Sequence, residues 1–95
     1  MVFQLFDGYS KKRDKLDILA GILHICSKET NKTEIMYQAG ISFSQLKEHI
    51  ALGIERNLLI ETEDSGIVKY STTERGIGLL QRYREIMDIL NGNQP

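Results

Sequence analysis

The apolar positions of the chain follow a helical period over most of its length. The first such stretch, Lys12 to Lys28, has an apolar stripe wide enough to contact more than one neighbouring element. After Asn57 the period changes, and two short runs rich in branched residues flank Asp64-Ser65-Gly66, a hairpin turn signal. We predict strands at Leu58–Glu63 and Ile67–Ser71.

A last helical pattern follows the hairpin. Thr72 or Thr73 is a suitable N-cap, and Ser71 with Glu74 forms an alternative capping box one register earlier. The apolar residues of this helix recur at coiled-coil spacing but over too few heptads to predict a coiled coil.

The stretch from Asn31 to Asn57 predicts two capped helices joined by a tight turn at Gly40. Ser42 and Gln45 form a capping box that starts the second helix, and Asn57 tolerates the left-handed conformation needed after its end. Two interpretations remain open from this pattern alone, a helix-turn-helix or an ordinary helical hairpin. The apolar stripe of the second helix is predicted to be Phe43, Leu46, Ile50 and Ile54.

Composition is that of one folded, soluble domain, with 41% hydrophobic and 26% charged residues in 95. The single cysteine, Cys26, lies on an apolar stripe, which favours a reducing compartment, and we expect a cytoplasmic protein. Neither a signal peptide nor a membrane-spanning segment is predicted.

The formal net charge of −1 does not favour nucleic-acid binding through an overall positive field. The first half of the chain is nevertheless mildly basic and the second half mildly acidic. Contact with a polyanion is therefore expected in the first half, which includes the run Lys11, Lys12 and Arg13.

The residue types that act in catalysis or bind metals do not form a catalytic or metal-binding motif in this sequence. His24 and His49 have no ligand partner at a suitable spacing, and we expect both on the surface. No nucleophile motif or phosphate-binding glycine loop is present. We therefore predict no enzyme activity, no cofactor or metal site, and no small-molecule ligand.

Specific residues resemble those of the archaeal winged helix-turn-helix DNA-binding proteins that dimerise through their C-terminal helix. The resemblance extends from Lys12 to about Leu90 and is most specific between Asn31 and Lys47. The matching residues are Lys15-Leu16-Asp17-Ile18, Asn31-Lys32-Thr33, Ile35-Met36-Tyr37, Ala39, Ile41-Ser42, Gln45-Leu46-Lys47, Leu59-Ile60, Thr73-Glu74 and Gly76.

The resemblance implies a mainly helical α+β fold, a winged helix-turn-helix with three helices, a two-stranded wing and a long last helix. The whole chain, 1–95, would be one domain, with an N-terminal arm at 1–10, a winged-helix core at 12–71 and a dimerisation helix at 72–91. The apolar residues expected to mediate homodimerisation are Leu79, Tyr83, Ile86, Met87 and Leu90.

The implied function is double-stranded DNA binding as a dimeric transcriptional regulator or architectural protein, with the recognition helix 42–57 in the major groove. The expected DNA-binding residues are Asn31, Lys32, Thr33, Tyr37, Ser42, Ser44, Gln45, Lys47 and Glu48, with further phosphate contacts possible from Lys11, Lys12 and Arg13.

Three features depart from the family pattern, and one of them, Asn57 in place of the glycine expected after the recognition helix, is structurally harmless. Glu34 stands where a basic residue is usual, and the wing tip is acidic, with Glu61, Glu63 and Asp64. The alternative hypothesis is therefore a winged helix that binds other proteins and not DNA. Gly53, inside a predicted helix, indicates the close approach of another element.

Overall fold

The structure, a computed structural model, describes residues 14–92. The predicted order of helices and strands is confirmed. The elements are α2 (Lys15–Ile25), α3 (Lys32–Ala39), α4 (Phe43–Glu55), β1 (Leu59–Asp64), β2 (Ile67–Thr72) and α5 (Glu74–Leu90). The predictions for the N-terminal arm and for Lys11, Lys12 and Arg13 lie outside the described residues.

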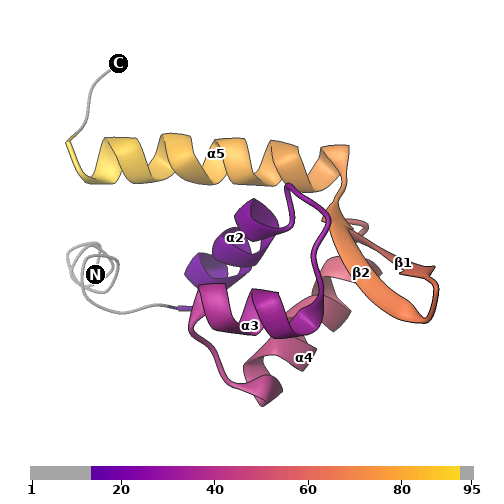
Figure 1. Cartoon of the computed structure of the whole chain (residues 1–95). Helices are drawn as coiled ribbons and strands as arrows, with labels where there is room; N and C mark the ends of the chain where they lie inside the picture. The colour runs from indigo at the N-terminus through magenta and orange to yellow at the C-terminus, as the bar shows by residue number, and fades with distance from the viewer. Residues whose placement is uncertain (1–13, 93–95) are drawn as a thin grey trace.

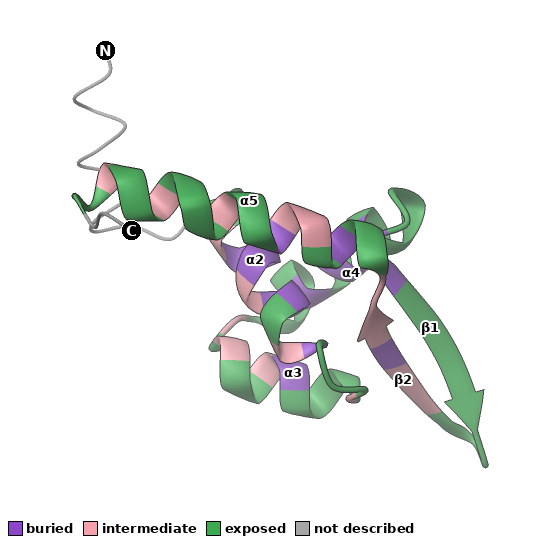
Figure 2. Ribbon diagram, turned by 90° about the horizontal axis from the view of Figure 1, so that it is seen from above, coloured by how far each residue is buried: buried purple, intermediate pink, exposed green. Residues whose placement is uncertain are grey.

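Helix α2 lies at the centre of the fold (Figure 1). Helix α5 crosses one side of α2. Helices α3 and α4 lie on the other side of α2, and the β1–β2 hairpin projects from one end of the domain. The C-terminal turns of α5 extend past α2 in both views, and their surface is largely exposed (Figure 2). The fold therefore has two separate ends, one formed by α5 and the other by α3 and α4.

Polar caps set where the helices begin and end. Asp14 and Asp17 form a capping box, so α2 begins at Lys15 and not at the predicted Lys12, and it ends at Ile25 and not at Lys28. The predicted capping box of Ser42 and Gln45 is confirmed at the start of α4. Gly40 ends α3 with a φ of 66°, in the left-handed conformation that glycine adopts without strain.

The hairpin is the predicted wing. Ser65 and Gly66 have φ values of 54° and 84°, the pair of positive values that a type I′ turn requires. The hydroxyl of Thr73 then accepts a hydrogen bond from the amide of Gly76 at 3.0 Å, which makes Thr73 the N-cap of α5. The alternative capping box of Ser71 and Glu74 is therefore not used.

The buried core brings together residues from α2, α3, α4 and the wing. It comprises Ile18, Leu19, Ile22, Leu23, Cys26, Ile35, Leu46, Ile50, Leu58, Leu59 and Tyr70. Burial raises the pKa of the Cys26 thiol to about 11, so this thiol stays protonated and unreactive at neutral pH.

The inward face of α4 differs from the predicted stripe. Phe43 is 56% exposed and Ile54 is 37% exposed, whereas His49, predicted on the surface, is only 3% exposed. The actual face runs through Leu46, His49, Ile50 and Gly53. Burial of His49 is tolerated because its Nδ1 donates to the carbonyl oxygen of Gln45 at 2.7 Å.

Backbone hydrogen bonds join the wing to the body of the domain. Thr30 and Tyr70 exchange two of them, at 3.1 and 2.8 Å, and the amide of Thr72 donates to the carbonyl of Cys26 at 2.9 Å. The Tyr70 side chain is buried in the core, and burial together with the neighbouring Glu61 carboxylate raises its pKa to about 12. The base of the wing is thus fixed, while its tip is exposed.

Two glycines allow the wing base to approach α4 and α5 closely. A β-carbon on Gly53 would lie 2.6 Å from a methyl group of Leu59, which accounts for the close approach predicted there. A β-carbon on Gly76 would lie 2.4 Å from the carbonyl oxygen of Leu58 and 2.6 Å from a methyl group of Thr72. The first turn of α5 therefore depends on glycine at position 76.

We expect Gly76→Ala to reduce the free energy of unfolding by about 1–3 kcal/mol, because the Leu58 backbone must move to relieve the overlap. The matched control is Gly21→Ala in α2, where an added β-carbon meets nothing within 4 Å. This control should raise the free energy of unfolding by roughly 0.5–1 kcal/mol through helix propensity. Urea unfolding measures both. Equal effects of the two substitutions would contradict the packing argument.

Candidate nucleic-acid interface

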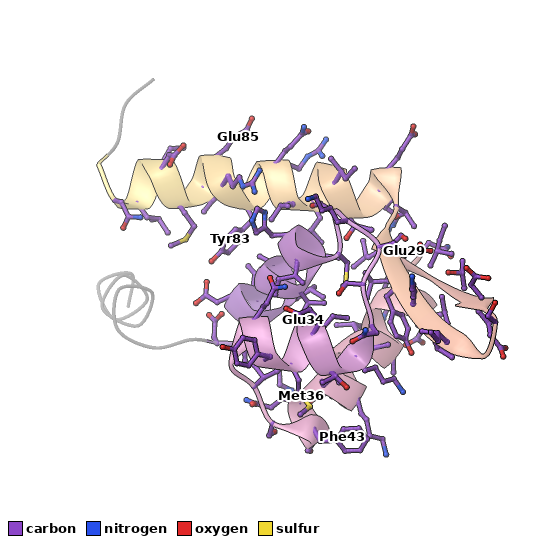
Figure 3. The ribbon with its side chains drawn as sticks, in the orientation of Figure 1. Glu29, Glu34, Met36, Phe43, Tyr83 and Glu85 are labelled. Carbon is purple, nitrogen blue, oxygen red and sulfur yellow. The ribbon has the colours of Figure 1, made fainter. Side chains whose placement is uncertain are left out.

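The first two turns of α4 carry the predicted recognition residues on one exposed surface. Because Leu46, His49 and Ile50 face the core, the side chains between them point outward. Ser42, Ser44, Gln45, Lys47 and Glu48 are all exposed, as predicted. This surface lies at the end of the molecule opposite α5, where Phe43 also projects (Figure 3).

The capping box restricts two of these side chains. The Ser42 hydroxyl accepts from the amide of Gln45 at 3.1 Å, and Oε1 of Gln45 accepts from the amide of Ser42 at 3.0 Å. These bonds satisfy amides that would otherwise lack a partner at the helix start. Ser42 and Gln45 therefore hold the start of α4 in place, and Ser44 and Lys47 extend from an already ordered turn.

Helix α3 supplies the other predicted contacts. Asn31, Lys32, Thr33 and Tyr37 are exposed, and Tyr37, at 83%, is the most exposed large hydrophobic residue between residues 14 and 92. The Asn31 side chain accepts from the amide of Glu34 at 2.9 Å. Asn31 is thus the N-cap of α3, which begins at Lys32.

The basic side chain of Lys15 also reaches this surface, although its place beside α4 was not predicted. Its Nζ lies 3.1 Å from a carboxylate oxygen of Glu48, and both side chains are largely exposed. A pair this exposed contributes about 0–1 kcal/mol to stability. Its importance for the site is that it places a cation beside the Glu48 carboxylate. The basic run at the start of the first helix was the only sequence signal for this.

A second unpredicted feature is an aromatic ring on the recognition surface. Phe43 is the first residue of α4, and the ammonium group of Lys47 lies 5.5 Å from its ring centroid. The two side chains meet because residues four apart lie on the same face of a helix. Cation–π contacts at exposed sites contribute about 0.5–1 kcal/mol. Lys47 and Phe43 therefore form one local unit.

The predicted dimerisation residues divide into two groups. Leu79 packs against the core of its own domain, and the Tyr83 hydroxyl donates to the Asp17 carboxylate of α2. Figure 3 shows Tyr83 on the side of α5 that faces the domain and Glu85 on the opposite side. Met87 and Leu90 are half-buried, whereas Ile86 is 49% exposed. Ile89, which was not predicted, is 70% exposed.

An open groove of about 470 Å³ runs between α2 and α5. Its apolar lining residues are Leu16, Leu58, Leu79, Tyr83 and Ile86, and Arg75 and Arg82 complete it. Both arginines donate to backbone carbonyls, Arg75 to Arg56 at 3.0 Å and Arg82 to Gly78 at 3.2 Å. The groove is therefore apolar with two fixed cationic groups at its border.

Within residues 14–92, no group of three or more histidine, cysteine or acidic side chains is arranged to hold a metal ion. His24, exposed as predicted, has its Nδ1 2.9 Å from a guanidinium nitrogen of Arg84. None of the described helices combines the length and apolar character needed to cross a membrane.

Comparison with known proteins agrees with this fold. The structure is similar to the crystal structure of Sso10a-2, a DNA-binding protein from Sulfolobus solfataricus, with a TM-score of 0.78, 22% sequence identity and coverage of 84% of each chain. This likeness shows that the two proteins share a fold.

A sequence relative is the uncharacterized protein MJ0290 of Methanocaldococcus jannaschii, 30% identical over 82 residues. The match covers 85% of this chain but only 37% of the length of that relative. A family model described as winged helix-turn-helix matches residues 12–91. This chain therefore belongs to the winged helix-turn-helix family.

Proposed function

We propose that this protein binds double-stranded DNA as a homodimer, without enzymatic activity, and acts as a transcriptional regulator. In this proposal, α4 enters the major groove, and α3 contacts phosphates beside it. Sso10a-2, whose fold this chain shares, is a DNA-binding protein. A cytoplasmic location, inferred from the single cysteine, remains a prediction.

The observation that carries the proposal is the exposed first half of α4. Ser44 and Lys47 are exposed in the capped first turns of α4. Phe43, the first residue of this helix, lies at the end of the domain away from α5 (Figure 3). A recognition helix contacts base edges with its N-terminal residues, and Ser44 and Lys47 are exposed in this part of α4. The geometry is therefore suited to insertion in a groove.

Attraction to DNA must come from local cations, because the net charge is −1. Lys32 and Lys47 are exposed on α3 and α4. Lys15 lies close to Glu48, and neutralisation by Lys15 reduces the repulsion between that carboxylate and a phosphate. Since few phosphates would be neutralised, the affinity should fall only shallowly with salt. Each neutralised phosphate contributes a slope of about −0.9 to a plot of log affinity against log salt concentration.

The exposed end of α5 supports the dimer. Its last turns extend past α2 (Figure 1). The C-terminal part of α5 carries the exposed Ile86 and Ile89 and the half-buried Met87 and Leu90, and Ile86 also lines the groove beside α2. A second copy related by a two-fold axis would cover the same apolar residues on both chains. DNA contact would then be presented twice, at the α4 surface of each protomer.

A protein-binding module is the second candidate, and the wing favours it. Glu61, Glu63 and Asp64 are exposed on β1, where they would repel phosphates, and Ile60 and Ile67 are each about half exposed. An acidic surface with apolar residues suits a basic protein partner better than DNA. Measurement of duplex binding separates the two candidates.

We expect Lys32→Ala to weaken binding to all duplex sequences alike, as the loss of a phosphate contact would. Lys47→Ala should weaken binding to preferred sites more than to random ones, as the loss of a base contact would. Fluorescence anisotropy with a selected duplex and a scrambled one, at several salt concentrations, measures both effects. Lys32→Ala should reduce the salt slope by about 1.

Lys69→Ala is a control for the general loss of positive charge, because Lys69 lies on the wing strand β2. It should change duplex affinity less than either other substitution. If the unmodified protein binds no duplex in low salt, or if Lys32→Ala and Lys47→Ala both bind normally there, the protein-interaction hypothesis replaces this one.

The dimer is tested by the double substitution Ile86→Glu with Leu90→Glu. Carboxylates on the exposed end of α5 cannot be buried in an apolar interface without a large desolvation cost. We expect a folded monomer by light scattering, with the far-ultraviolet circular dichroism of the unmodified protein. Gln81→Glu, at an exposed position one helical turn before Glu85, should leave the dimer intact. A monomeric unmodified protein at high micromolar concentration would refute the dimer.

A further inference from the structure

The first residue of α4 is a phenylalanine that lies partly on the protein surface. Phe43 is 56% exposed, although it is a large apolar residue. It lies outside the core cluster that orients α4 and outside the partly buried residues packed against that cluster. More than half of this residue is therefore open to contact with a ligand at the start of α4.

Lys47 keeps this ring beside a positive charge. The ammonium group lies 5.5 Å from the ring centroid, one helical turn along α4. The outward surface of α4 thus combines an apolar ring and a cation with the small hydroxyl of Ser44. An exposed cation complements a polyanion. Contact between the ring and an apolar group on the same ligand would add stabilisation by removing apolar surface from water.

The floor of the major groove offers one apolar group. Its base edges present hydrogen-bond donors and acceptors, together with the C5-methyl group of thymine. Aromatic and other apolar side chains on recognition helices contact that methyl group. As the first residue of α4, Phe43 is among the N-terminal residues that come nearest to base edges.

We infer that Phe43 is a specificity-determining residue that packs its ring against the 5-methyl group of thymine in the major groove. Lys47, whose ammonium group lies beside the ring, provides positive charge next to the DNA. The inference rests on the proposed function, because it names the base feature that the same surface recognises. The DNA sites that the protein binds most tightly should then have thymine where the first residues of α4 meet the base edges.

The test compares the full chain on two duplexes of identical sequence, one with thymine and one with deoxyuridine at every thymine position. Deoxyuridine keeps the base pair and removes only the methyl group. Burial of one methyl group should tighten binding about fourfold, so the unmodified protein should bind the thymine duplex at least that much more tightly. The duplex sequence is first selected from a random pool by the unmodified protein.

Two variants assign the effect to the ring. Phe43→Ala should bind thymine and deoxyuridine duplexes with nearly equal affinity and should keep the salt slope of the unmodified protein. Tyr37→Ala, which removes the exposed aromatic side chain of α3, should leave the ratio of the two affinities unchanged. Circular dichroism and thermal unfolding establish that both variants are folded.

A gain of affinity provides an independent readout. In a guanine–cytosine duplex, replacement of cytosine by 5-methylcytosine adds the same methyl group to the major groove. The unmodified protein should bind the methylated duplex more tightly, and Phe43→Ala should not.

The failures of the two proposals are distinguishable. Equal affinity of the unmodified protein for thymine and deoxyuridine duplexes would overturn the role of Phe43 while leaving DNA binding intact. A thymine preference that persists in Phe43→Ala would also overturn it. Absence of binding to any duplex at low salt would overturn the proposed function itself.

Discussion

The rotation of α4 about its own axis is the constraint on which the rest of the structure depends. Leu46 and Ile50 are buried in one cluster with Ile22, Leu23 and Ile35, which belong to α2 and α3. Close-packed cores permit few alternative rotations, because each would expose these residues or leave a cavity. Once the rotation is fixed, the outward residues of α4 are fixed as well. A substitution in the core of α2 would therefore change which α4 side chains are exposed, although the substituted residue itself lies outside the α4 surface.

Local signals in the sequence predicted the elements well, because caps and turns depend on a few adjacent residues. Ser42 with Gln45, Asn31, Gly40 and the Ser65-Gly66 turn all act as the sequence indicated. The burial of individual side chains on α4 was less predictable. A stripe through Phe43 and Ile54 and one through His49 and Gly53 differ by a modest rotation, and the neighbouring helices decide between them.

The same limit applies to the candidate site. Exposure of Ser44, Lys47 and Glu48 followed from the predicted start of α4, because the cap sets the helical register. The position of Lys15 beside Glu48 depends on how α2 packs against α4, and periodicity within one helix contains no such information. Phe43 was missed for a related reason. An apolar residue at helical spacing is usually assigned to the core, and only the packed structure shows that this one is left outside.

Connections between α2 and α5 determine how a dimer would present its two recognition helices. The Tyr83 hydroxyl bonds to Asp17, and Arg84 contacts His24, so α5 is held to the helix whose other side supports the core of α4. A 17-residue helix is about 26 Å long. Two copies joined through their exposed α5 ends would therefore hold their α4 surfaces at a separation set mainly by α5 and by its angle to α2.

Such a separation would select the spacing between two half-sites on DNA, since each α4 must meet the major groove on the same face of the duplex. Loss of the Tyr83–Asp17 contact would loosen that spacing without removing any side chain that is proposed to contact DNA.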